Sequence, residues 1–139
     1  MSYSRRDFAR MAAAAVPLSR LAAKDINSKV AGVRLGVQSY SFRDLGLDDA
    51  IQAMVADQLG ECELFSPHIE AGGVQALISI FQPPSGVKRT QEETRAAFKA
   101  YNDKVRAWRL SVPLQFFVDV KRKFDDAGVR LYEIGRAHV

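Results

Sequence analysis

Cysteine is nearly absent from this chain, which contains one such residue among 139. Cys62 therefore cannot form a disulfide within the chain, and its place in the strand-like run 61–65 favours a small buried side chain over a nucleophile. Long hydrophobic runs are also lacking, since none reaches the roughly 18 residues of a conventional membrane span. The sequence thus predicts neither an internal disulfide nor a stable membrane anchor.

Unbalanced positive charge is scarce outside the first residues. The formal net charge is +4, but residues 1–23 hold four arginines and a single aspartate, so the rest of the chain is nearly neutral. Clustered Lys and Arg are how proteins neutralise nucleic-acid phosphates. The only basic run of the body, 121–123, has acidic neighbours and fits a solvated helix face. We therefore expect no nucleic-acid partner.

The first 23 residues have the order of an export signal. Arg5 and Arg6 precede the short, weakly apolar run 11–18, and residues 21–23 offer small side chains for cleavage. The paired arginines, with Phe8 two positions later, resemble the twin-arginine signal, which a receptor recognises and which is not an anchor. We expect a signal peptide at 1–23, export to the periplasm or outside the cell, and the twin-arginine translocation machinery as a partner. A basic, alanine-rich cytoplasmic helix is the alternative.

From residue 33 the chain alternates strand and helix patterns. The β-branched and aromatic run 33–40 predicts a first strand, and the apolar spacing that follows Asp48, with a stop at Gly60, predicts a helix. The run 61–65 predicts a second strand. Strand, helix and strand within about 33 residues form one βαβ unit, which implies parallel strands.

The second half of the chain predicts two helices and a third strand. Residues 74–81 are apolar but of ambiguous type, and a loop follows at 82–88. Thr90 and Glu93 form a capping box that starts a helix, whose core-facing stripe is Ala97, Phe98, Tyr101, Val105 and Trp108. A further helix is expected from Pro113 to Gly128, before a strand at 129–132; its buried face is predicted to comprise Leu114, Phe117, Val118 and Phe124.

The last seven residues, 133–139, match what one reading frame of a common sequencing adapter would encode. We interpret them as an artefact, give His138 no functional role, and keep a genuine C-terminus as the alternative.

A complete β/α barrel needs about 250 residues. Any barrel to which this chain belongs would therefore have most of its strands elsewhere, and we expect the isolated chain to expose strand edges and to behave poorly in solution.

Two segments carry a resemblance to a known family. Residues 33–42 (VRLGVQSYSF) and 59–70 (LGECELFSPHIE) resemble the first two strands of the sugar phosphate isomerase/epimerase family, and 108–110 with 124–128 resemble its approach to the third strand. The resemblance covers 30–132 and implies an α/β fold class: a partial xylose isomerase-like TIM (β/α)8 barrel of about three β/α units, preceded by the signal peptide.

The resemblance also implies chemistry. In this family a divalent metal (Mn, Mg, Co or Zn) polarises a sugar carbonyl and hydroxyl while acidic residues move a proton between neighbouring carbons. The metal ligands come from later strands, so no metal ligand and no catalytic residue is assigned within this chain. We expect the parent protein to be an exported isomerase or epimerase acting on a sugar or polyol, and the fragment itself to be inactive. A noncatalytic carbohydrate-binding barrel and an apurinic-site endonuclease-like barrel are the alternatives.

Barrel sites gather at the carboxyl ends of the strands. This rule gives the candidate substrate-binding residues Gln38, Tyr40, Ser66, His68 and Glu70. Three roles are open for His68: binding sugar hydroxyls, binding a metal, or a loop histidine bonded to backbone. For Glu63, within the second strand, a structural hydrogen bond is favoured because a buried charge demands a partner.

Overall fold

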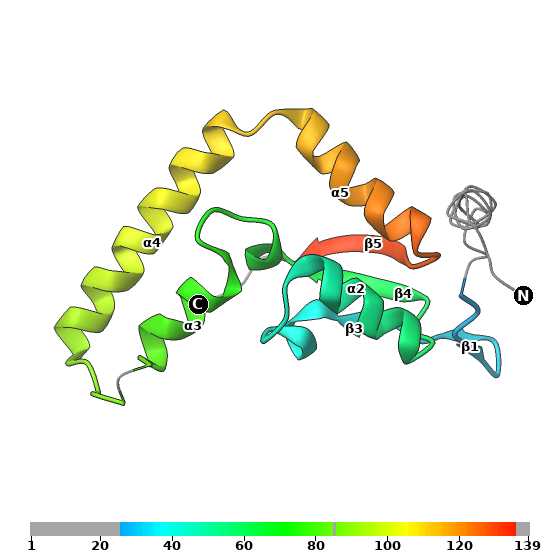
Figure 1. Ribbon diagram of the computed structural model, residues 1–139, viewed down its shortest axis with the longest axis horizontal. Helices are drawn as coiled ribbons and strands as arrows, with labels where there is room; N and C mark the ends of the chain where they lie inside the picture. Colours follow the sequence, from blue (N-terminus) through cyan, green and yellow to red (C-terminus); the bar gives the residue numbers. More distant parts are fainter. Residues whose placement is uncertain (1–25, 85, 136–139) are drawn as a thin grey trace, which may run out of the picture.

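The computed structural model describes residues 26–84 and 86–135, which form a mixed α/β structure (Figure 1). The predicted signal segment at 1–23 and His138 lie outside these residues. A parallel sheet has the order β3 (Val37–Gln38), β4 (Glu61–Phe65), β5 (Arg130–Gly135), and a separate antiparallel hairpin joins β1 (Lys29–Val30) to β2 (Val33–Arg34). No helix within the described ranges is long and apolar enough to cross a membrane.

The prediction of one strand over 33–40 is wrong, because this run divides into two short strands that belong to different sheets and the start of a 3₁₀ helix. Val33–Arg34 pairs backwards with β1 across a two-residue turn in which Ala31 and Gly32 have φ of 49° and 85°. Positive φ at both central residues matches the twist of a tight hairpin. Only Val37–Gln38 joins the parallel sheet, and Ser39–Phe42 continues as the 3₁₀ helix η2.

The first predicted helix is confirmed as α2 (Leu47–Ala56), with Asp48 and Asp49 in its first turn, where negative charge favours the helix dipole. The helix ends before Gly60, and Gln58 takes the left-handed position with φ of 56°. Gly60 serves a different purpose. A Cβ there would lie 2.1 Å from the Ile26 carbonyl oxygen, so the residue allows two backbone segments to approach each other.

The ambiguous run at 74–81 belongs to a helix, α3 (Gly73–Phe81), which follows the short 3₁₀ helix η3 (Ser66–His68). Helix α4 (Gln91–Ser111) starts at the predicted capping box, where Thr90 Oγ1 accepts from the Glu93 amide at 3.2 Å. Helix α5 (Leu114–Asp126) begins after Pro113, and Gly128, with φ of 72°, precedes β5. The third strand is therefore found, and it extends three residues beyond the predicted 132.

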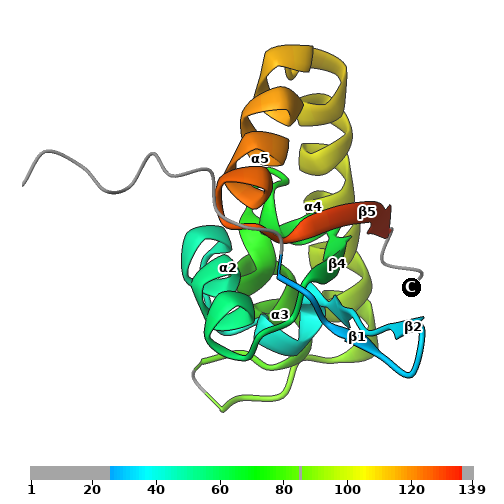
Figure 2. The same ribbon diagram turned by 90° about the vertical axis from the view of Figure 1, so that its right-hand side faces the viewer.

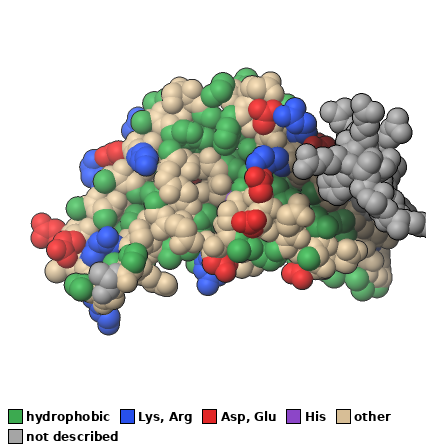
Figure 3. All heavy atoms as spheres, in the orientation of Figure 1, with side chains coloured by type: hydrophobic (Ala, Val, Ile, Leu, Met, Phe, Trp, Pro, Cys, Tyr) green, Lys and Arg blue, Asp and Glu red, His purple; other side chains and the backbone are tan. Residues whose placement is uncertain are grey.

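Helices α2 and α5 pack on the same face of the sheet, as Figure 2 shows. Their contacts with the strands form the main core, which contains Ala50, Ile51, Met54, Cys62, Leu64, Val120, Phe124 and Val129. A second cluster joins Phe65 to α3 and α4. The predicted face of α5 is partly right, since Phe124 is buried and Phe117 packs against the core. Leu114 and Val118 are 82% and 55% exposed, and Val120, which was not predicted, is buried. Hydrophobic side chains gather on the surface where α4 meets α5 (Figure 3).

Strand β5 includes residues 133–135, which the sequence interpretation assigns to an adapter. They pair with β4 in the register Glu63↔Glu133, Leu64↔Ile134 and Phe65↔Gly135, after a shift between Cys62 and Glu63. This pairing does not test where the residues come from, so their adapter origin stays a prediction.

Candidate functional site at the carboxyl ends of the strands

The carboxyl ends of β3, β4 and β5 point toward α3 and α4, while the hairpin lies at the opposite end (Figure 1). All five sequence-predicted residues lie at this end. Gln38 is the last residue of β3 and Tyr40 lies in η2, whereas Ser66 and His68 lie in η3 and Glu70 follows it. The structure divides these five residues among four local environments.

His68 belongs to a buried bridge between the first two strand ends. The fully buried Ser39 accepts a hydrogen bond from the Phe65 amide at 2.8 Å, and its Oγ lies 2.8 Å from His68 Nδ1. The Ser39 hydroxyl proton is then directed to Nδ1, which leaves His68 Nε2–H to donate to the Phe42 carbonyl at 3.4 Å. Burial lowers the pKa of His68 and favours this neutral form. Both ring nitrogens are thus engaged within the protein, the geometry of a loop histidine bonded to its surroundings.

Gln38 lies on the sheet face opposite α2 and α5. Cys62 and Leu64 point into the core, so the alternation of β4 places Glu63 on the other face. Gln38 pairs with Glu63 in the strand register, and its Nε2 donates to Glu63 Oε1 at 2.7 Å. The structural hydrogen bond predicted for Glu63 is present.

Tyr40 is an exposed residue at the rim. Its ring meets the Phe65 ring edge-on, with centroids 5.0 Å apart, and the Arg43 guanidinium carbon lies 4.9 Å from the Tyr40 centroid. The contact with Phe65 orients the ring, and 44% of the residue remains exposed. Tyr40 therefore presents an ordered aromatic surface beside the strand ends.

Ser66 and Glu70 line a polar hollow at this end. The Glu70 side chain is only 7% exposed and is bound by Arg109 of α4, whose Nε donates to Glu70 Oε1 at 2.8 Å and whose Nη2 contacts the same oxygen. A cavity of about 420 Å³ lies on one side of this ion pair and one of about 260 Å³ on the other. Ser66, Glu70 and Arg109 line both cavities.

The sequence reasoning missed two residues of this hollow, Tyr101 and Arg109. Tyr101 appears in the sequence as part of the core stripe of α4, and its ring does join the cluster around Phe65. Tyr101 also lines the larger cavity, while its hydroxyl is buried. Arg109 carries no local signal, since its partner Glu70 lies 39 positions earlier.

Within the described residues, neither Cys62 nor a cluster of metal-ligating side chains adds a reactive group. Cys62 is buried in the core, and burial raises the pKa of its thiol to about 12, so it remains a protonated small hydrophobe as predicted. Across residues 26–84 and 86–135, no group of three or more His, Cys, Asp or Glu side chains is placed to hold a metal ion. The described strand ends thus offer binding groups rather than a complete metal centre.

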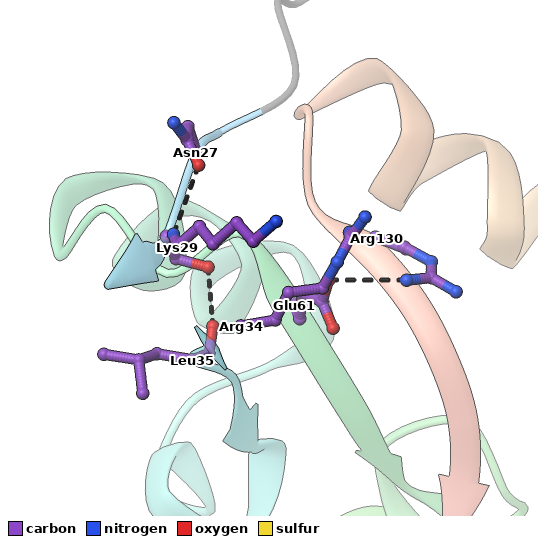
Figure 4. A network of polar contacts seen from close by, with 7 residues as sticks. Asn27, Lys29, Arg34, Leu35, Glu61 and Arg130 are labelled. Atoms are coloured by element: carbon purple, nitrogen blue, oxygen red, sulfur yellow. Dashed lines mark hydrogen bonds and ion pairs between the residues drawn. The ribbon is translucent and has the colours of Figure 1, made fainter. Parts of the chain in front are cut away.

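The amino ends of the strands carry a different network (Figure 4). Glu61 accepts from Arg34 at 2.7 Å and from Arg130 at 3.4 Å, which joins the hairpin to β4 and β5. The Arg34 hydrogen bond is the main cause of the lowered pKa of Glu61. Nearby, Ser28 Oγ donates to the Leu35 carbonyl at 2.6 Å. These contacts are structural.

Comparisons with protein-family models, with curated proteins and with solved structures find no match to this chain.

Proposed function

We propose that this chain is the N-terminal part of an exported β/α barrel protein of the sugar phosphate isomerase/epimerase kind, and that its strand ends contribute to binding a sugar or polyol. The observation that carries the proposal is the sheet order. Three parallel strands follow one another in chain order, and the helices α2 and α5 that connect them pack on one face. A β/α barrel begins in this way, with its helices outside.

Half of a doubly wound sheet has the same order, so the other face of the sheet matters. In a doubly wound fold, helices also cover that face, and its strands are apolar on both sides. Here β4 carries Glu61 and Glu63 on the face away from α2 and α5, and Gln38 lies beside Glu63. A polar face is better accommodated inside a barrel, near a polar ligand, than beneath an apolar helix layer. This favours the barrel.

The family chemistry requires a divalent metal, and the described residues do not supply its ligands. We therefore propose that the metal ligands, with the acid and base groups, lie on strands outside residues 26–135. The part left to this chain is to bind and orient the substrate through groups such as Glu70, Ser66 and Gln38. No proton-transfer step is assigned to these residues.

The test is the gene region that follows codon 139 in an independent clone, expressed with the present chain as one protein. We expect further strand-end Glu, Asp and His residues, retention of a divalent metal after dialysis, and interconversion of a sugar or polyol. If the protein holds no metal and converts no sugar, the isomerase assignment fails, and a noncatalytic carbohydrate-binding barrel replaces it if sugars still bind.

Export is tested separately with residues 1–30 fused to a folded reporter. We expect the reporter to leave the cytoplasm, and Arg5→Lys with Arg6→Lys to retain it there, because a twin-arginine receptor recognises the pair. Export of the double variant at the unaltered rate would contradict the twin-arginine assignment. Equal retention of both fusions would favour the cytoplasmic helix alternative.

A further inference from the structure

The larger cavity beside Glu70 has the size of a small-molecule site. Its volume is about 420 Å³, within the range of roughly 300–1,000 Å³ that ligand pockets occupy. The segment from η3 to α3 forms one wall, and α4 forms the other. The charged residues that line it are Glu70, Asp103, Arg106 and Arg109, and Ser66 adds a hydroxyl group.

Two nearly buried side chains offer oxygen atoms without a protein partner. Ser66 is 6% exposed, and the Glu70 side chain is 7% exposed. Both contacts from Arg109 reach Glu70 Oε1, so Oε2, like Ser66 Oγ, has no partner among the described residues. Only the Tyr101 hydroxyl is both buried and unpaired in that part of the chain. Ser66 Oγ and Glu70 Oε2 therefore open onto the hollow that their residues line.

The charges around the larger cavity leave one arginine without an acidic partner. Asp103 is paired with Lys99 of the same helix at 2.6 Å, and Glu70 is bound by Arg109. Arg106 forms no ion pair with any residue in 26–84 or 86–135, although it lines the cavity. With Lys99 included, three cations stand against two carboxylates, which gives a formal sum of +1. A ligand with one negative charge would neutralise the site.

Arg106 is placed to act together with Glu70 and Ser66. It lies three positions before Arg109 on α4, and residues at this spacing have Cβ atoms about 5–6 Å apart on one side of a helix. Arg109 holds Glu70, so a ligand bound to Arg106 also lies beside Glu70. A guanidinium binds a carboxylate through two parallel N–H bonds. Carboxylate and hydroxyl oxygens suit the hydroxyl groups of a ligand.

We infer that the larger cavity binds a hydroxylated monocarboxylate, such as a sugar acid. The ligand carboxylate accepts from Arg106, and a ligand hydroxyl donates to Glu70 Oε2 beside Ser66. A phosphate monoester carries about −1.5 to −2 charges, which exceeds the single positive charge of the site. The inference rests on the proposed function only in taking this ligand to be the substrate, and Arg106 thereby becomes its specificity-determining residue.

The experiment uses the full 139-residue chain at constant ionic strength, with D-gluconate as the probe and ligand-observed NMR titration as the measurement. We expect Arg106→Gln to raise the Kd for gluconate at least tenfold, the effect of one lost hydrogen bond between charged groups. Lys104→Gln is the matched control. It removes the same charge from an exposed position of α4 outside the cavity, so the Kd should stay the same. Arg106 is also exposed, so the fold should tolerate its replacement.

Ser66→Ala tests the hydroxyl side of the cavity. We expect this variant to raise the Kd for gluconate about twofold to tenfold and to leave the Kd for acetate unchanged, because acetate has no hydroxyl group. Three further probes should each bind more weakly than gluconate. Xylitol lacks the negative charge, acetate lacks the hydroxyl groups, and glucose 6-phosphate carries more charge than Arg106 balances.

The inference is overturned if gluconate does not bind, if Arg106→Gln leaves its Kd unchanged, if Lys104→Gln raises it equally, or if glucose 6-phosphate binds more tightly. These outcomes are distinct from failure of the proposed function. Arg106-dependent gluconate binding in a complete gene product that converts no sugar would remove the isomerase and leave this site standing. A complete gene product that converts a sugar but does not bind gluconate would do the reverse.

Discussion

Removing the Ser39 hydroxyl tests the bridge between the first two strand ends. Ser39→Ala leaves the buried Phe65 amide without an acceptor and His68 Nδ1 without a donor. An unsatisfied buried backbone group costs about 1–3 kcal/mol, and the lost bond to the half-buried imidazole adds about 0.5–1.5 kcal/mol. We expect the free energy of unfolding to fall by about 2–3 kcal/mol.

Urea unfolding followed by far-UV circular dichroism, at a pH above the histidine range, measures this loss. With a slope of about 1–3 kcal/mol per molar urea, the midpoint should fall by about 1 M or more. Ser41→Ala is the matched control, because Ser41 lies exposed in the same η2 helix and should change stability by less than about 0.5 kcal/mol. In a His68→Ala background, Ser39→Ala should cost about 1 kcal/mol less. Equal midpoints for the two serine variants would refute the bridge.

Three further predictions concern other parts of the fold. Because the pKa of His68 is lowered in the folded chain, the free energy of unfolding should be greatest above pH 6.5 and should fall as the pH drops below that value. His68→Gln should remove this pH dependence, which urea titrations at several pH values measure. Gly60→Ala should destabilise by about 1–3 kcal/mol, because the added Cβ would clash with backbone. Gly46→Ala should cost less in thermal melts, since its Cβ would meet only Asp49 Oδ2, at an ordinary contact distance of 3.9 Å. Thr90→Ala should cost about 0.5–2 kcal/mol and speed amide exchange in the first turn of α4; unchanged exchange would contradict the cap.

Elements with local signals were predictable from the sequence. The capping box at Thr90 marks the start of α4 because two side chains satisfy backbone donors within four residues. Gly128 marks the end of α5 for a similar reason, since it takes the left-handed conformation that glycine adopts without strain. Strand β4 occupies the predicted 61–65. In each case the residues that determine the element lie within a few positions of it.

The misassigned parts depend on distant contacts. The pairing of Val33–Arg34 with β1 depends on Ala31 taking a positive φ, a conformation that alanine rarely adopts and that its presence in the sequence does not indicate. The buried face of α5 depends on how the helix meets α2 and β4, and it combines Phe117, Val120 and Phe124 rather than Leu114 and Val118. The apolar periodicity of α5 is compatible with either set of residues as the buried face, and only the packing of the helix against its neighbours decides which set is buried.

The candidate site shows the same division. Its place at the carboxyl ends of the strands follows from the order of elements, so all five predicted residues lie at that end. Their partners were not predictable, because Ser39 reaches His68 across 29 positions and Glu70 reaches Arg109 across 39. Long-range pairs of polar side chains leave no periodic pattern in a sequence.

Two glutamates of β4 show how the ends of the sheet differ. Glu61 and Glu63 point to the same face, yet Glu61 is bound by two arginines, whereas Glu63 receives a hydrogen bond from the neutral amide of Gln38. The charge at the amino end is thus compensated, which ties the hairpin to the sheet. Glu63, nearer the carboxyl end, is hydrogen-bonded by a neutral side chain and has no arginine bound to it among the described ion pairs. In β/α barrels the amino ends of the strands serve stability and the carboxyl ends serve function, so this difference is what the proposed barrel would lead us to expect.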